Sequence, residues 1–153
     1  MPKSVIAFAP GRVELLGNHT DYNEGFALAA AIDLGVTVRA ERLEGDVLEV
    51  SSETTGRQAT TPLDMTEPFT GDAGWVNYPL GVIRALREAG LAIGGLRLQV
   101  SSNLPLGWGL SSSAAFEVST ALAALGLYHQ GVEPMTLAKL CQTHLKHHEF
   151  VSV

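Results

Sequence analysis

The stretch PLGWGLSSSA, residues Pro105–Ala114, lies at a predicted corner between a strand and a helix. The strand is expected over Leu96–Ser101, LRLQVS, because apolar and polar residues alternate there as they do in a half-buried strand. The helix is expected to be capped by Ser112 or Ser113 and to run to about Leu127, since serine is favoured at helix N-termini. This order of elements predicts a binding site for an anion.

The loop itself has the composition of a phosphate-binding loop. Gly107 and Gly109 let the backbone approach an anionic ligand closely, and Ser111, Ser112 and Ser113 add hydroxyl groups. The free N–H groups at the start of the helix point toward such a ligand. No lysine follows the second glycine, so the loop differs from the Walker pattern. The alternative interpretation is an ordinary glycine-containing turn with a serine cap.

The rest of the chain predicts an α+β domain. Ser4–Ala9 is expected to form a strand that ends at Pro10, and Arg12–Glu24 to form a structured loop. The remaining expected elements are strands over Phe26–Ile32, Val36–Glu41 and Val47–Ser51 arranged as a meander, a long loop over 52–74 with at most one short strand, a helix from Trp75 to Gly90 with Pro79 in its first turn, and a last helix from Glu133 toward Phe150.

Length and composition favour one compact domain and exclude several classes of protein. The chain has 153 residues, of which 46% are hydrophobic, so it is not intrinsically disordered. A formal net charge of −6 has the wrong sign for a partner of nucleic acid. Cys141 is the single cysteine, which excludes an intramolecular disulfide. We find no signal or membrane segment and expect a cytoplasmic protein without a membrane partner.

A second polar segment, near the N-terminus, has the chemistry of a sugar-binding loop. Hydroxyl-rich ligands need converging hydrogen-bond donors and acceptors, which this segment supplies. The alternative is a turn in which Asn and Asp side chains cap their own backbone. The segment is Arg12–Asn23, and its candidate sugar-binding residues are Arg12, Asn18, His19, Asp21 and Asn23.

Two further groups are weaker candidates. The aromatic rings of Trp75 and Tyr78 could flank an adenine, although aromatic residues more often belong to a core. His144, His147 and His148 could share one helix face and bind a metal, but histidines near a helix C-terminus also occur without any ligand.

Together these segments resemble the galactokinases, which belong to the GHMP class of small-molecule kinases. The segment APGRVELLGNHTDYNEG (Ala9–Gly25) is similar to the family's sugar-binding signature, and LPLGWGLSSSAAFEV (Leu104–Val118) to its ATP phosphate loop. WVNYPLGV (Trp75–Val82) resembles the segment that contacts the nucleotide base. The resemblance implies the GHMP kinase N-terminal domain, an α+β fold related to domain 2 of ribosomal protein S5. It also implies that ATP phosphorylates galactose at the anomeric hydroxyl, with Mg²⁺ as cofactor.

The resemblance also implies a role for each matching residue. Arg12 would lie near the transferred phosphoryl group, and Asn18, His19 and Asp21 would bind the sugar. The ATP and magnesium residues would be Trp75 and Tyr78 at the adenine, Gly107, Gly109, Ser111, Ser112 and Ser113 at the phosphates, and Ser112 at Mg²⁺ as well.

Four positions depart from the family's pattern. Asn18 replaces a usual glutamate that accepts from a sugar hydroxyl, and His147 stands at the position of a magnesium-binding glutamate. Leu80 replaces a common lysine and Ser152 a common glycine.

The printed sequence ends at Val153, before the family's catalytic aspartate motif and its second domain. We therefore expect residues 1–153 to be the N-terminal domain or a truncated form, inactive alone and prone to self-association through the surface that the second domain would cover. The alternatives are a non-catalytic galactose- and ATP-binding regulator, or a GHMP kinase for another sugar or small alcohol.

Overall fold

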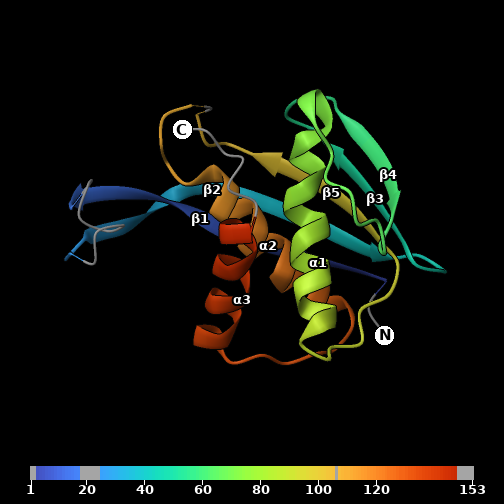
Figure 1. Ribbon diagram of the computed structural model, residues 1–153. Helices are drawn as coiled ribbons and strands as arrows, with labels where there is room; N and C mark the ends of the chain where they lie inside the picture. The colour runs from blue at the N-terminus through green and yellow to red at the C-terminus, as the bar shows by residue number, and fades with distance from the viewer. Residues whose placement is uncertain (1–2, 18–24, 106, 148–153) are drawn as a thin grey trace.

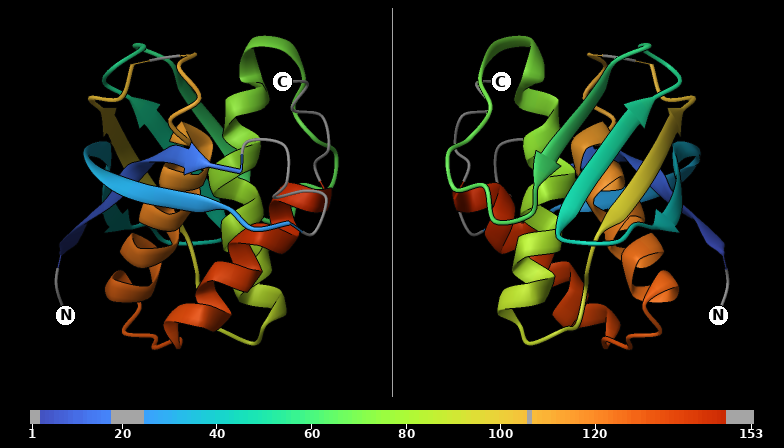
Figure 2. Two further views of the ribbon diagram at one scale, coloured as in Figure 1. Left: turned by 90° about the vertical axis from the view of Figure 1, so that its left-hand side faces the viewer. Right: turned by 90° about the vertical axis from the view of Figure 1, so that its right-hand side faces the viewer.

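In the computed structural model of the protein, the described residues fold into one five-stranded sheet with helices packed on one face (Figures 1 and 2). The structure describes residues 3–17, 25–105 and 107–147, the last five without their side chains. Its elements are β1 (Ser4–Leu16), β2 (Leu28–Arg42), β3 (Val47–Ser52), β4 (Gln58–Pro62), the 3₁₀ helix η2 (Gly71–Val76), α1 (Asn77–Glu88), β5 (Leu96–Ser102), α2 (Ser112–Leu127) and α3 (Pro134–His147). The predicted α+β class is confirmed.

The strand order is β1-β2-β5-β3-β4, so the predicted meander is wrong. β5 pairs antiparallel with β2 and parallel with β3, and therefore separates two strands that are neighbours in the sequence. The alternation of β5 places Leu96, Leu98 and Val100 on the buried face, which suits a strand in the middle of the sheet. Local patterns could not reveal this insertion, because it depends on a pairing between distant segments.

β1 and β2 are longer than predicted, and they form a ribbon that extends beyond the helices (Figure 1). Arg12–Leu16 belongs to β1 and is not a loop, because the register shift between Pro10 and Arg12 absorbs the break in the pattern. β2 continues through the predicted break at Gly35, which pairs with Pro10. A side chain at Gly35 would collide with the carbonyl oxygen of Ala9, so the close approach requires glycine.

The three α-helices pack on one face of the sheet, with α2 in direct contact with the strands. α2 lies on β1 and β2, α1 packs beside α2, and α3 contacts both of these helices (Figure 2). The buried apolar core between the layers includes Val38, Ala40, Leu48, Val50, Leu96 and Leu98 from the sheet and Ile83, Leu86, Ala121, Ala124 and Leu127 from the helices. None of the described helices is both long and apolar enough to cross a bilayer. As predicted, Pro79 lies in the first turn of α1.

The two later helices begin in different ways. At α2 the N-cap position is Ser111, not Ser112 or Ser113, and no side chain caps the helix there. At α3 the Glu133 carboxylate accepts a 3.0 Å hydrogen bond from the backbone N–H of Thr136, in agreement with the predicted start. The predicted serine cap of α2 is therefore wrong, and the N-terminal N–H groups of this helix have no side-chain cap.

Candidate active site

Two segments nearly a hundred residues apart meet at the start of α2. The backbone N–H of Arg12 donates a 3.0 Å hydrogen bond to the carbonyl oxygen of Leu110. The side chain of Arg12 donates from Nε to Oγ of Ser111, also at 3.0 Å. A Cβ atom at the buried Gly11 would lie 2.8 Å from the Leu110 oxygen, so the fit between strand and loop requires glycine there. The predicted phosphate loop is thus joined to the β1 strand that carries Arg12.

The loop has the backbone of an open cradle. Gly107 and Gly109 have φ angles of 77° and 66°, in the left-handed region that favours glycine. A Cβ atom at either position would meet no heavy atom within 4 Å. Ser111 is also left-handed, with a φ of 59°, and it turns the chain into α2. The space beside the two glycines is therefore available to a ligand that approaches the backbone.

A cavity of about 310 Å³ opens at this junction. Its walls are formed by Arg12, Pro105, Gly107, Trp108, Gly109, Leu110, Ser111, Ser112 and Ser113. Arg12 gives the described lining a positive charge, and its Nη1 lies 3.3 Å from the Oε2 of Glu14. A guanidinium, three hydroxyls and an uncapped helix N-terminus are suited to an anion with several oxygens.

A second cavity, of about 360 Å³, lies on the other side of Ser112 and Ser113, which line both. Trp75 and Tyr78 are in its wall, as the resemblance implied for residues beside an adenine. The ring of Tyr78 lies 6.3 Å from that of Phe116, measured between centroids. An aromatic cavity next to a phosphate-type loop has the dimensions and chemistry of a site for a flat ring linked to an anionic chain.

Some residues of the aromatic cavity could not be found from the sequence. Ser52, Thr54, Thr55 and Arg57 line it, from the end of β3 and the loop that follows. Thr54 is held there because its Oγ1 accepts a 3.0 Å hydrogen bond from the N–H of Ser102. In the sequence these lining residues lie in a polar stretch, 52–74, that is rich in glycine and proline. Such a composition is typical of any surface loop and does not indicate a binding site.

Asn77 has a different role from its aromatic neighbours. Its Oδ1 accepts a hydrogen bond from the N–H of Phe69 at 2.9 Å, and its Nδ2 donates to the Phe69 carbonyl at 2.8 Å. These two bonds fix Phe69, just before η2, and η2 contains Trp75.

Several predicted residues fall outside what the structure describes. Asn18, His19 and Asp21 lie in the segment 18–24, and His148 lies beyond residue 147. The side chains of His144 and His147 are likewise outside the described part. Within that part, no group of three or more His, Cys, Asp or Glu side chains is arranged to hold a metal ion. Ser112 is exposed, and its hydroxyl oxygen is a hard ligand of the kind that Mg²⁺ prefers.

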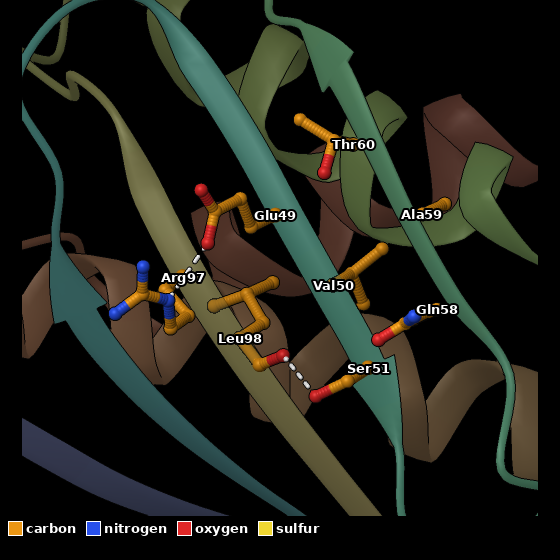
Figure 3. A pocket seen from close by; sticks show the side chains of 8 residues that line it. All are labelled: Glu49, Val50, Ser51, Gln58, Ala59, Thr60, Arg97 and Leu98. Atoms are coloured by element: carbon orange, nitrogen blue, oxygen red, sulfur yellow. Dashed lines mark hydrogen bonds and ion pairs between the residues drawn. The ribbon is translucent and has the colours of Figure 1, made fainter.

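A third hollow, of about 550 Å³, lies against the strands β3, β4 and β5 (Figure 3). Arg97 donates a 2.7 Å hydrogen bond to Glu49 there, and its Nη1 lies 3.8 Å from Glu41. The charges of Figure 3 are thus paired with one another across the strands. We therefore assign the candidate site to the two cavities beside α2.

A buried carboxyl group lies in α2, one turn beyond the loop. Glu117 is fully buried, and neither of its oxygens has a hydrogen-bond partner among the described residues. Burial raises the pKa of Glu117 to about 8, so the group is mostly protonated at neutral pH. The pKa of Tyr78 is raised, mainly by burial and to a smaller extent by the nearby Glu117. The same two causes raise the pKa of Cys141 to about 11.

The two halves of the site correspond to two known sequence families. Residues 1–42 match the galactokinase galactose-binding signature, and residues 77–149 match the GHMP kinases N-terminal domain. The first match includes β1 with Arg12, and the second includes α1, the phosphate loop and α2. The chain carries a GHMP kinases N-terminal domain. The resemblance seen in the sequence motifs is confirmed.

The chain is similar to the N-terminal part of galactokinases. It is 39% identical over 145 residues to the galactokinase of Pyrococcus furiosus and 42% identical over 142 residues to that of Streptomyces coelicolor. These matches cover 95% and 92% of this chain but 39% and 36% of the relatives. The chain therefore spans less than two fifths of the length of those curated relatives.

Solved structures agree with the sequence matches. The Lactococcus lactis galactokinase, solved in complex with galactose, superposes with a TM-score of 0.85 at 32% identity and covers 99% of this chain and 39% of its own. A mevalonate kinase superposes with a TM-score of 0.81 at 24% identity and covers 95% of this chain and 47% of its own. The second likeness concerns the fold alone, and it supports the GHMP kinase N-terminal architecture.

Proposed function

We propose that residues 1–153 form the sugar- and ATP-binding N-terminal domain of a galactokinase. The whole enzyme would phosphorylate galactose at the anomeric hydroxyl and give galactose 1-phosphate and ADP. The observation that carries the proposal is the junction of Arg12 with Ser111, which joins the sugar-signature strand to the phosphate loop. Without this junction, the two motifs would be separate matches to a family pattern.

The chain's own residues divide the work of binding between the two cavities. Trp75, Tyr78 and Phe116 would enclose the adenine. The backbone N–H groups and the serine hydroxyls of the loop from Gly107 to Ser113 would hold the phosphates. Arg12 would neutralise charge on the terminal phosphoryl group as the sugar oxygen forms its bond to phosphorus and the bond to ADP breaks. Asn18, His19 and Asp21 are proposed to bind the hydroxyls of the sugar.

The residues present suit a magnesium ion that is carried by the nucleotide. Ser112 would contribute its hydroxyl oxygen, while phosphate oxygens and water would provide the other ligands, as is common for Mg²⁺. When bound, the ion would neutralise phosphate charge. We propose that the base comes from an aspartate motif of the family outside residues 1–153, so that residues 1–153 alone bind both ligands but do not transfer phosphate.

Binding measurements on Arg12 test this proposal. Isothermal titration should give saturable binding of a non-hydrolysable ATP analogue with Mg²⁺ and of D-galactose. Arg12→Gln should weaken binding of the ATP analogue about tenfold and binding of ADP much less, since charge-assisted contacts to the terminal group are lost. Arg39→Gln, on an exposed side chain of β2, is the matched control and should change neither. Absence of binding by the unmodified chain contradicts the proposal, and so does an equal loss for both nucleotides.

A further inference from the structure

Trp108 is exposed in a way that is unusual for tryptophan. It lies between Gly107 and Gly109 in the phosphate loop, and 76% of its surface is accessible. Tryptophan is normally well buried, because exposing its large apolar surface to water costs free energy. A bare indole in a binding loop is therefore a candidate contact for a ligand.

The indole belongs to one of the two cavities only. Trp108 lines the cavity that contains Arg12 and Ser111, and it is absent from the described lining of the other cavity. That other cavity already has aromatic walls from Trp75, Tyr78 and Phe116. The aromatic side chains are thus divided between the two cavities. Trp108 is the one aromatic residue in the described lining of the cavity that contains Arg12.

The chemistry around Trp108 separates the possible ligands. A phosphate group has no apolar face and gains little from an indole ring. A hexose has hydroxyls around its edge and C–H groups on its faces, so an aromatic plane and nearby polar groups can bind it together. In galactose the axial hydroxyl leaves the hydrogens of neighbouring ring carbons together on the opposite face, which creates one continuous apolar patch.

We propose that Trp108 is a specificity-determining residue that stacks on the apolar face of the acceptor hexose. The guanidinium of Arg12 and the serine hydroxyls line the same cavity and would meet the polar edge of the reacting end. This inference rests on the proposed function, because it takes the acceptor to be a hexose. It adds a sugar contact in the phosphate loop, separate from the polar sugar-binding segment near the N-terminus.

The chain contains two tryptophans, one in each cavity, and this allows a direct test. In Trp75→Phe the remaining indole is Trp108, and titration with D-galactose should change its emission in a saturable way. In isothermal titration, Trp108→Ala should weaken galactose binding about tenfold and leave binding of the Mg²⁺–ATP analogue within twofold. Trp108→Phe should retain most of the affinity. Met135→Ala, on an exposed apolar residue of α3, is the control.

The outcomes distinguish this inference from the proposed function. If the unmodified chain binds both ligands and Trp108→Ala binds galactose normally, the stacking role is wrong and the proposed function stands. A loss confined to the ATP analogue, or an equal loss in Trp108→Phe and Trp108→Ala, also overturns the stacking role. If the unmodified chain binds neither ligand, both proposals are wrong.

Discussion

The Nε of Arg12 donates a 3.0 Å hydrogen bond to the Oγ of Ser111, across 99 positions of sequence. The bond joins β1 to the residue that turns the phosphate loop into α2, and a backbone bond between Arg12 and Leu110 strengthens the same junction. An arginine on a strand and a serine on a loop thereby act on one cavity. Rigid placement of such groups is the main requirement for phosphoryl transfer.

The open cradle at Gly109 predicts a loss of nucleotide binding in Gly109→Val. Valine would fill space that is empty in the structure and would strain a backbone with a φ of 66°. Gly45→Val is a matched control, because Gly45 has a φ of 81° and equally empty surroundings at the β2–β3 turn. Melting curves should shift similarly in both variants, while titration with the Mg²⁺–ATP analogue should weaken only in Gly109→Val. Equal affinities would contradict a ligand at the cradle.

A substitution at Ser112 can distinguish a phosphate-binding loop from an ordinary turn at the start of α2. Ser112→Asp should weaken binding of the ATP analogue by at least tenfold, because negative charge would face negative charge. The same change should keep or raise the melting temperature, since a carboxylate in the first turn of α2 interacts favourably with the helix dipole. Ser112→Asn is the uncharged control. Undiminished affinity in Ser112→Asp, measured by calorimetry, would leave a turn with no phosphate site.

The buried Glu117 predicts that stability falls as pH rises. The usual pKa is 4.5 and the folded value is about 8, so between these values the folded state holds a proton that the unfolded state releases. The free energy of unfolding therefore decreases through this range, by at most about 1.4 kcal/mol per pH unit. Glu117→Gln should remove this decrease, whereas Glu44→Gln, at an exposed position, should retain it. Urea titrations at pH 5, 7 and 9 provide the measurement, and parallel pH profiles for the unmodified chain and Glu117→Gln would show that burial does not control this group.

Phosphoryl transfer by residues 1–153 alone is expected to be indistinguishable from background. A positioned general base contributes roughly 10² to 10⁴-fold to such reactions. Residues 1–153 match less than two fifths of the length of the galactokinases they resemble, so we expect them to lack part of the catalytic machinery. An ADP-release assay with pure protein, ATP, Mg²⁺ and galactose measures the rate. Galactose-dependent turnover that co-purifies with the chain would show that these residues are sufficient for transfer.

Exposed apolar residues on the β1–β2 ribbon lead us to expect self-association. The large exposed side chains there are Ile6, Phe8, Leu15, Leu16 and Leu28. Ile6 and Phe8 alternate along β1 with residues that pack against the core, so they lie on the face away from the helices. Leu16→Glu should raise the concentration at which light scattering detects dimers, and Met135→Glu on α3 should not. A monomer at all practical concentrations contradicts the expectation.

Local chemistry explains which parts of this structure could be predicted from the sequence. Gly107, Gly109 and Pro79 act through their own backbone geometry, so the loop and the start of α1 could be located. The position of β5 between β2 and β3 and the approach of Arg12 to Ser111 depend on partners far along the chain. The sequence predicts Ser112 or Ser113 as the N-cap of α2, one or two residues after the observed Ser111, because the three serines are locally equivalent.

The central position of β5 also affects how the nascent chain folds. β2 ends at Arg42, and β5, which pairs with one of its edges, begins only at Leu96. That edge of β2 therefore remains unpaired while the intervening residues are synthesised. β3 has its parallel edge open over the same interval and can pair only with β4. Unpaired strand edges are templates for association with other chains. We therefore expect the growing chain to be most prone to aggregate before β5 has been synthesised.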